Sequence, residues 1–309
     1  MLTRNIRLLN LDGSVKSQQK LILQYHPEIL ELEGLGPSAR LWMSQHTANL
    51  IDARIRDSSS NQVTFLGSGD FHHLSYLLIK QIKEPISLIV FDFHPDWDIV
   101  PPRLGCGSWV TQALRNENIQ KCLLIGTSSD DLSWPAIQSA NLNSLNKDRL
   151  EIYPYSHNPT TIFLRSVPGN RSLRLEKSLL STKIIWSELK DNNLSDFFLD
   201  QIKRLPTKKV YISIDKDCLR SDSALTNWEE GKLSLGQLLM MLQIIKEKLD
   251  IVGLDITGDY SKISISGTIK GLISRLDHPK EIKADKLPQD LITSINESTN
   301  LKILDLLNS

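Results

Sequence analysis

The sequence predicts an α/β protein of three layers, α/β/α, in which helices cover both faces of a central parallel sheet. Short apolar runs rich in Ile, Val and Phe alternate along the chain with amphipathic stretches, an order that is typical of parallel sheets with right-handed crossovers. Residues 88–91 form an uninterrupted apolar run, as expected of a strand buried on both faces. With 309 residues, 40% of them hydrophobic, the chain can bury a large core.

The expected elements follow in order along the chain. Apolar or alternating runs predict strands at residues 63–66, 88–93, 122–126, 151–155, 183–186, 210–214 and 251–256. Apolar residues at helical spacing predict helices at residues 73–83, 108–115, 194–204 and 234–248. We expect residues 1–60 to form an N-terminal extension packed on the core, and residues 61–309 to form the metal-binding domain. The serines at 58–60 indicate a flexible join between the two.

Composition excludes several classes of function. The formal net charge is zero and the pI about 7.1, so nothing indicates a nucleic acid or an acidic membrane as partner. No apolar run approaches the roughly 18 residues of a membrane span, and the first residues lack the apolar core of a signal peptide. Three scattered cysteines fit a reducing cytoplasm. We therefore expect a cytoplasmic protein with a small-molecule substrate, and homo-oligomerisation stays open.

An Asp-x-His-x-Asp triplet follows the apolar run at 88–91. Alternate side chains of an extended segment share a face, so Asp92, His94 and Asp96 are expected to project together from the carboxyl end of the strand. Two carboxylates and an imidazole form a site suited to Mn, Fe, Zn or Ni. The alternative is that the carboxylates cap the next turn and His94 is incidental.

Two further segments carry similar residues. The alternating run at 209–214 ends in Asp215 and Asp217, and the run at 63–66 breaks at glycines before Asp70, His72 and His73. Ligands of open α/β sheets bind outside the carboxyl ends of the strands. If these strands are neighbours, their carboxylates would repel one another unless cations neutralised them.

Taken together, the three segments resemble the arginase/agmatinase (ureohydrolase) family of binuclear metal hydrolases. That family carries Gly-Gly-Asp-His, then Asp-x-His-x-Asp, then Ser-x-Asp-x-Asp, and the residues from Gly67 to His72 look like a stretched version of the first motif. Residues 92–96 match the second motif and Ser213 begins the third. The resemblance covers roughly residues 60–260 and implies an arginase/deacetylase-like fold in a divergent branch.

The resemblance implies two divalent metal ions, with Mn expected first and Fe, Zn or Ni as alternatives. The six implied ligands are His72, Asp92, His94, Asp96, Asp215 and Asp217. Asp92 and Asp215 would bridge the ions, which would acidify a shared water. The resulting hydroxide would attack a C–N bond of an amidine, guanidine or amide. Asp98 or Asp70 would orient ligands or accept a proton.

Three departures from the family pattern concern the substrate. The family's guanidinium-binding Glu aligns with Gly258, beside Asp259, and Cys106 stands where a His is common, which makes its thiol a catalytic candidate. The loop at 225–231 also differs. Because the metal motifs are kept while the expected substrate residues differ from those of the family, we expect poor activity on free arginine and agmatine. The candidate substrate-binding residues are Trp109, Asn227, Trp228, Glu229 and Glu230, and Trp97 is a further candidate pocket wall.

Three other functions are compatible with the same residues. A mononuclear deacetylase-like amidohydrolase would share the fold and an Asp-x-His element, although a full set of six ligands favours two ions. A non-catalytic metal-binding scaffold would explain the absent Glu. A third alternative uses Cys106 as a nucleophile, since nearby positive charge lowers a thiol pKa.

Overall fold

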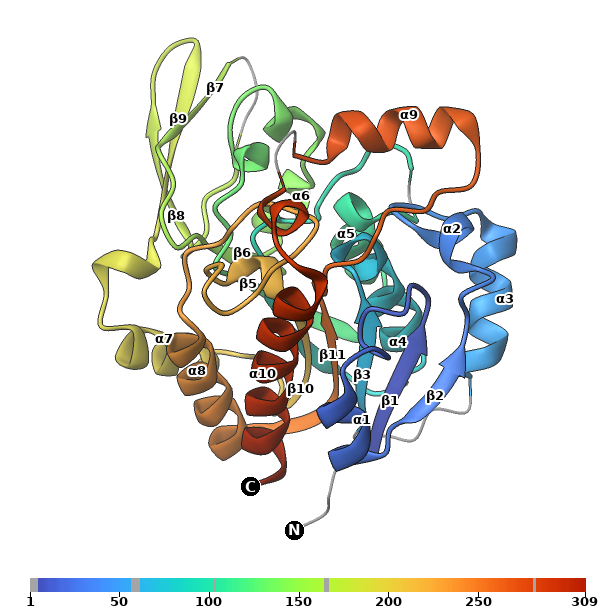
Figure 1. The fold of residues 1–309 in the computed structure, drawn as a ribbon. Coiled ribbons are helices and arrows are strands. Elements are labelled where there is room, and N and C mark those ends of the chain that lie inside the picture. Colours follow the sequence, from blue (N-terminus) through green and yellow to red (C-terminus); the bar gives the residue numbers. More distant parts are fainter. Residues whose placement is uncertain (1–4, 57–61, 103, 164–166, 280–281) are drawn as a thin grey trace.

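A computed structural model describes residues 5–56, 62–102, 104–163, 167–279 and 282–309. Eight strands form one sheet in the order β2-β1-β3-β11-β10-β4-β5-β6, and every neighbouring pair is parallel (Figure 1). The strands span Asn5–Asn10 (β1), Glu28–Glu31 (β2), Gln62–Gly67 (β3), Ile86–Phe91 (β4), Ile119–Ile125 (β5), Leu150–Tyr153 (β6), Lys209–Asp215 (β10) and Asp250–Thr257 (β11). The predicted parallel sheet is confirmed.

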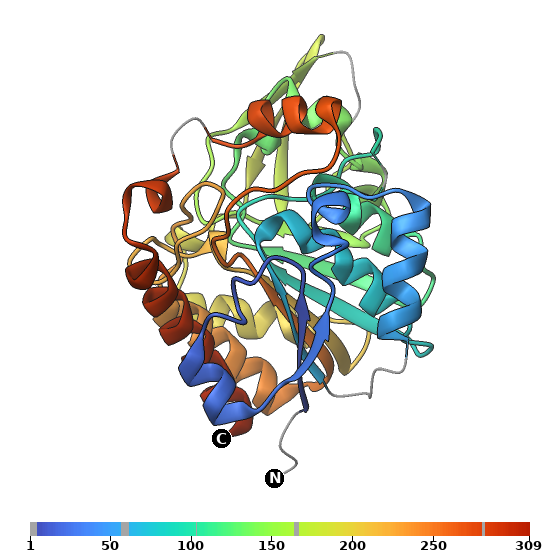
Figure 2. The ribbon, with the colours of Figure 1, turned by 45° about the vertical axis from the view of Figure 1, so that its right-hand side comes forward.

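Helices cover both faces of this sheet (Figure 2). Side chains of α3, α4, α5 and α6 pack in one apolar cluster, and those of α1, α7, α8 and α10 pack in a second. Strand β4 contributes to both clusters, because its alternate side chains point to opposite faces of the sheet. Leu88 and Val90 belong to the first cluster, and Ile89 and Phe91 belong to the second. The α-helices are Gln19–Tyr25 (α1), Gly36–Ala39 (α2), Gln45–Ile55 (α3), Ser75–Ile79 (α4), Trp109–Ala113 (α5), Leu142–Asn146 (α6), Leu194–Lys203 (α7), Leu235–Lys248 (α8), Thr268–Asp277 (α9) and Gln289–Asn308 (α10).

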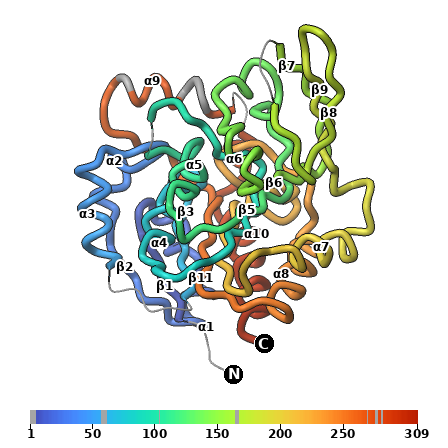
Figure 3. Tube along the Cα trace, turned by 180° about the vertical axis from the view of Figure 1, so that it is seen from behind, coloured from blue at the N-terminus to red at the C-terminus, as the bar shows by residue number. Residues whose placement is uncertain are grey.

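The strand predicted at 183–186 does not join the central sheet. It forms part of β9 (Ser181–Trp186), the middle strand of a separate antiparallel sheet with β7 (Thr160–Phe163) and β8 (Leu173–Lys177). This three-stranded sheet projects beyond the helices in the views from the front and from behind (Figures 1 and 3). Leucines alternate with charged residues at the start of β8, and buried residues alternate with more exposed ones along β9, a pattern typical of a sheet with one solvated face.

The N-terminal segment contributes to the same sheet. Strand β1 pairs with both β2 and β3, so residues 5–56 supply the two strands beyond β3. Arg7 interrupts the apolar pattern of β1 and pairs with Glu28 of β2 at 2.9 Å, which explains why neither strand was predicted. The serines at 58–60 lie outside the described residues, and the division near residue 60 remains an expectation.

The predicted helix at 73–83 is shorter than expected. A 3₁₀ turn, Gly69–Leu74, precedes α4, and this turn carries the histidines of the first motif. None of the described helices is long and apolar enough to cross a membrane. The four strands β3, β11, β10 and β4 are consecutive in the middle of the sheet. The three motifs, which follow β3, β4 and β10, therefore lie together at the carboxyl ends of these strands.

Candidate metal centre

The sheet register brings the second and third motifs side by side. Phe91 of β4 is opposite Ile214 of β10, so Asp92 and Asp215 leave adjacent strands at the same level. Gly67 ends β3 with a φ of +88°, a conformation that favours glycine. The chain then turns into the 3₁₀ segment, where the Ser68 side chain caps the Asp70 amide at 3.3 Å and His72 faces the two strands.

The first group of donors surrounds His72. Its Nδ1 lies 3.1 Å from Asp92 Oδ2, 3.3 Å from Asp96 Oδ2 and 3.5 Å from Asp215 Oδ2. All four side chains are buried. Trp109 packs on the His72 ring with a centroid distance of 4.7 Å and donates its Nε1–H to Asp96 Oδ2 at 2.7 Å. Trp109 therefore holds two candidate ligands in place.

The second group surrounds His94. Its Nδ1 lies 3.0 Å from Asp217 Oδ2 and 3.9 Å from Asp92 Oδ1. The two oxygens of Asp92 thus face different histidines, and Asp92 belongs to both groups that could hold a metal ion. This is the arrangement expected of a carboxylate shared by two ions.

The electrostatics of the cluster fit two cations. Burial, followed by repulsion from Asp96 and Asp217, raises the pKa of Asp92 well above its usual range. Burial and then Asp217 raise the pKa of Asp215 to about 8. Four carboxylates and two imidazoles at these distances form a donor set suited to Mn, Fe, Zn or Ni. The residues present therefore fit a pair of divalent ions, which would remove the repulsion.

His73 lies outside this cluster. Both of its ring nitrogens are buried and have no hydrogen-bond partner among the described residues, and burial lowers its pKa to about 3. His72, one position earlier, directs Nδ1 at three carboxylates. The geometry thus brings His72, rather than His73, to the candidate ligands.

Replacement of each histidine provides a test. We expect His72→Ala to lower the Mn content of loaded protein by about one ion per chain, because one of two sites loses a ligand. We expect His73→Ala to keep the metal content of the wild type. Metal analysis of the purified variants measures both, and loss confined to His73→Ala would reverse the assignment.

A cavity of about 760 Å³ opens over the cluster. Asp92, His94, Asp96, Asp215 and Asp217 reach it, together with His72. Its other walls combine aromatic, aliphatic, acidic and small residues, and none of the described lining residues is Lys or Arg. These walls include Trp42, Trp97, Trp228, Cys106, Asp98, Asp130, Asp131 and Glu229.

Only some of the predicted substrate residues reach this cavity. Trp228 and Glu229 do, and Glu229 Oε2 lies 3.3 Å from His94 Nε2. Trp109, Asn227 and Glu230 are not among the residues that line it, and their role in substrate binding stays a prediction. Trp109 is buried against the ligands. Glu230 turns outward, where its carboxylate accepts from Ser221 and pairs with Lys283 at 3.4 Å.

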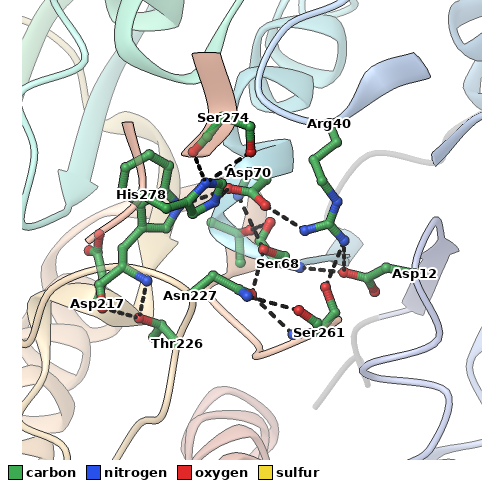
Figure 4. A network of polar contacts seen from close by, with 12 residues as sticks. Asp12, Arg40, Ser68, Asp70, Asp217, Thr226, Asn227, Ser261, Ser274 and His278 are labelled. Atoms are coloured by element: carbon green, nitrogen blue, oxygen red, sulfur yellow. Dashed lines mark hydrogen bonds and ion pairs between the residues drawn. The ribbon is translucent and has the colours of Figure 1, made fainter. Parts of the chain in front are cut away.

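Asn227 anchors the loop instead. Its Oδ1 accepts from Ser68 Oγ at 3.0 Å and from the Ser261 amide at 3.0 Å, and its Nδ2 donates to the Ser261 carbonyl at 2.8 Å (Figure 4). Because Asn227 is buried, these bonds satisfy an amide that would be costly to leave unpaired. They fix the backbone beside Trp228.

Asp70 is also structural. Its Oδ2 pairs with Arg40, and its Oδ1 accepts from His278 Nε2 at 2.9 Å and from Trp228 Nε1 at 3.0 Å (Figure 4). Trp228 stacks on His278 with a centroid distance of 4.7 Å. Asp70 therefore fixes a cavity wall and does not orient metal ligands directly. Arg40 and His278 were not predicted, since they are 30 and 208 residues away from Asp70.

Asp98 and Cys106 both face the cavity. Burial, and to a lesser degree Asp131, raise the pKa of Asp98 to about 6, and Ser139 Oγ donates to its Oδ1 at 2.6 Å. Cys106 begins a short 3₁₀ turn, Cys106–Ser108. Both residues therefore belong to the wall of the cavity.

The position of the family's Glu cannot be filled here. Gly258 has a φ of +86°, and a Cβ at this position would lie 2.4 Å from Asp215 Oδ1. Asp259 does not take its place, because its Oδ1 pairs with Lys216 Nζ at 2.8 Å and accepts from Gln18 Nε2 at 2.6 Å.

Comparison with known proteins defines the class of fold. No family model matches the chain. An uncharacterised protein of Thermotoga maritima is 30% identical over 197 residues, which cover 64% of this chain but only 58% of that relative. Solved structures match more fully: an Entamoeba histolytica arginase in complex with L-ornithine (TM-score 0.59, 10% identity, 100% of both chains), a Bacillus subtilis formimidoylglutamase (0.58, 14%, 99% and 87%) and a Bacillus caldovelox arginase (0.56, 12%, 97% and 98%).

The chain therefore has the α/β fold of the ureohydrolases. The fold that the three motifs implied is thus confirmed, at identities of only 10–14% to these structures.

Proposed function

We propose that the protein is a binuclear metal-dependent hydrolase of C–N bonds, acting on an amidine, guanidine or amide. The observation that carries this proposal is the position of Asp92 between two groups of donors, one around His72 and one around His94. The fold adds support, since the structures that share it are named as arginases and a formimidoylglutamase.

Each donor has a part in the proposed chemistry. His72 and Asp96 would hold one ion, His94 and Asp217 the other, and Asp92 with Asp215 would belong to both. Two divalent ions, with Mn the first candidate, supply a polarised substrate and a water acidified to near neutral pH. Asp98 faces the same space and could accept a proton, because its raised pKa lies near neutrality. Trp228 and Glu229 would orient the substrate.

The substrate is proposed to be a cation. The cavity contains Asp98, Asp130, Asp131 and Glu229 besides the metal-ligand candidates, and its described lining offers no Lys or Arg. A carboxylate on the substrate would meet no Lys or Arg of the described lining, whereas an amidinium or guanidinium could form charge-assisted hydrogen bonds with its carboxylates. Glu229 lies beside the cluster, with its Oε2 at 3.3 Å from His94 Nε2.

Arginine and agmatine form a matched pair that tests this charge preference. They differ by one carboxylate, so we expect kcat/KM for arginine to be lower by about tenfold or more, a difference of roughly 1.4 kcal/mol in transition-state binding. Both should be poor substrates, because no carboxylate can stand at Gly258. Urea release by Mn-loaded protein measures the ratio. Efficient hydrolysis of arginine would contradict the proposed pocket.

A screen of amidines, guanidines and amides with Mn-loaded protein tests the function itself. We expect hydrolysis that a chelator abolishes and added Mn²⁺ restores. An Asp217→Asn variant should lose this activity while keeping its fold. Absence of turnover on every compound, with two ions bound, would favour a metal-binding scaffold. A single ion per chain with amide hydrolysis would favour a mononuclear deacetylase-like enzyme. Activity abolished by alkylation or by Cys106→Ser would point to a thiol nucleophile.

A further inference from the structure

Behind His72 lies a chain of buried hydroxyl groups that ends in a carboxylate. His72 Nε2 is 2.8 Å from Ser213 Oγ, and Ser213 Oγ is 2.6 Å from Asp255 Oδ1. Tyr211 OH donates to the other oxygen of Asp255 at 2.8 Å, and Ser75 Oγ donates to Asp255 Oδ1 at 3.0 Å. All of these residues are buried, Ser213 and Asp255 completely.

The strands explain how these groups meet. Tyr211, Ser213 and Asp215 are alternate residues of β10, so they share one face of the sheet. Ser213 is opposite Asp255 of β11 in the register. The strand therefore presents a metal-ligand candidate at its end, and two hydroxyl groups that contact Asp255 behind it.

The directions of the hydrogen bonds follow from the donors available. An ionised carboxylate only accepts, so the single proton of Ser213 goes to Asp255. Ser213 then has only lone pairs to offer His72, and His72 must donate from Nε2. That assignment leaves the lone pair on Nδ1, the atom that faces Asp92, Asp96 and Asp215.

We propose that Asp255, acting through Ser213, is a positioning residue that holds His72 in the tautomer and orientation required to bind a metal ion. The inference rests on the proposed metal centre but not on its hydrolytic activity. Outer partners of this kind fix the ring of a ligating histidine and increase its basicity. Trp109 stacks on the ring from the side, and Asp255 fixes it from behind.

Titration of metal-free protein with Mn²⁺ tests the proposal without any substrate. We expect Ser213→Ala to weaken the site of His72 about 10–100-fold, the usual cost of removing such a partner. The site of His94 should change by no more than about threefold, because its contacts do not involve Ser213. Calorimetry gives both affinities, and the Mn–Mn coupling in electron paramagnetic resonance reports whether both sites fill.

The chain offers a matched control. Tyr211→Phe removes the hydroxyl that donates to the other oxygen of Asp255 at 2.8 Å and leaves the bond between Ser213 and His72 in place, so both Mn²⁺ affinities should stay within about threefold of the wild type. Asp255→Asn is isosteric and keeps the fold testable if Ser213→Ala fails to fold. Its amide can donate to Ser213 and turn the Ser213 proton towards His72, so the loss should equal or exceed that of Ser213→Ala.

Three results would overturn the proposal. These are wild-type affinity at both sites in Asp255→Asn, equal losses at the two sites, and a loss in Tyr211→Phe as large as that in Ser213→Ala. Failure of the proposed function looks different. A wild-type protein that hydrolyses nothing, yet loses one Mn²⁺ site in Ser213→Ala, would retain the role of Asp255 and refute the hydrolase.

Discussion

Replacement of Asp92 by Ala is expected to remove both metal ions from the protein. Its two oxygens face His72 and His94 separately, so each of the two sites loses a ligand. We expect Mn-loaded protein to fall from about two ions per chain to near none. Metal analysis after gel filtration measures this.

Asp131→Asn serves as the control for Asp92→Ala. It removes a carboxylate from the same cavity, but Asp131 belongs to neither group of metal donors. Its metal content should equal that of the wild type. Full metal content in Asp92→Ala would refute the assignment of a shared ligand, and loss in Asp131→Asn would show that general acidity, rather than coordination, retains the ions.

Replacement of Lys216 by Met is expected to lower the free energy of unfolding more than the other substitutions do. Lys216 is completely buried and pairs with Asp259 at 2.8 Å. Burial lowers the pKa of Lys216, while the charge of Asp259 opposes that shift. Removing the cation strands a buried carboxylate, which costs about 3–5 kcal/mol. Urea unfolding of the metal-free protein gives the free energy of unfolding.

Two controls separate the buried charge from the lost side chain. Lys216→Met combined with Asp259→Asn should recover much of the loss, because the uncompensated charge is gone. Lys209→Met removes an exposed partner of Glu84, and pairs of that kind contribute about 0–1 kcal/mol. A loss below about 1 kcal/mol in Lys216→Met would contradict the proposed importance of the pair.

The sequence predicted the parts of the fold that depend on local pattern. Strands β4 and β10 are apolar runs ended by acidic residues, and both lie where that pattern placed them. The six candidate ligands come together because strand ends in a parallel sheet meet at one edge. Strand β1 escaped prediction because the burial of Arg7 depends on Glu28, a partner in another strand.

The walls of the cavity could not be predicted in the same way. Glu229 and Glu230 are neighbours in one loop, yet only Glu229 faces the cavity. Glu230 turns outward to Ser221 and Lys283, and Lys283 is far away in sequence. Which of two neighbouring side chains faces the cavity depends on long-range contacts, and the local sequence does not show these contacts.

The bond between Trp228 and Asp70 has an evolutionary consequence. Trp228 shapes the cavity, but its partner Asp70 lies in the same 3₁₀ turn as His72. A mutation that remodels this wall therefore leaves Asp70 with one fewer donor and disturbs Arg40 and His278, which share that carboxylate. We expect strong epistasis among these four positions. Lineages that change specificity through residue 228 should therefore do so by concerted replacement.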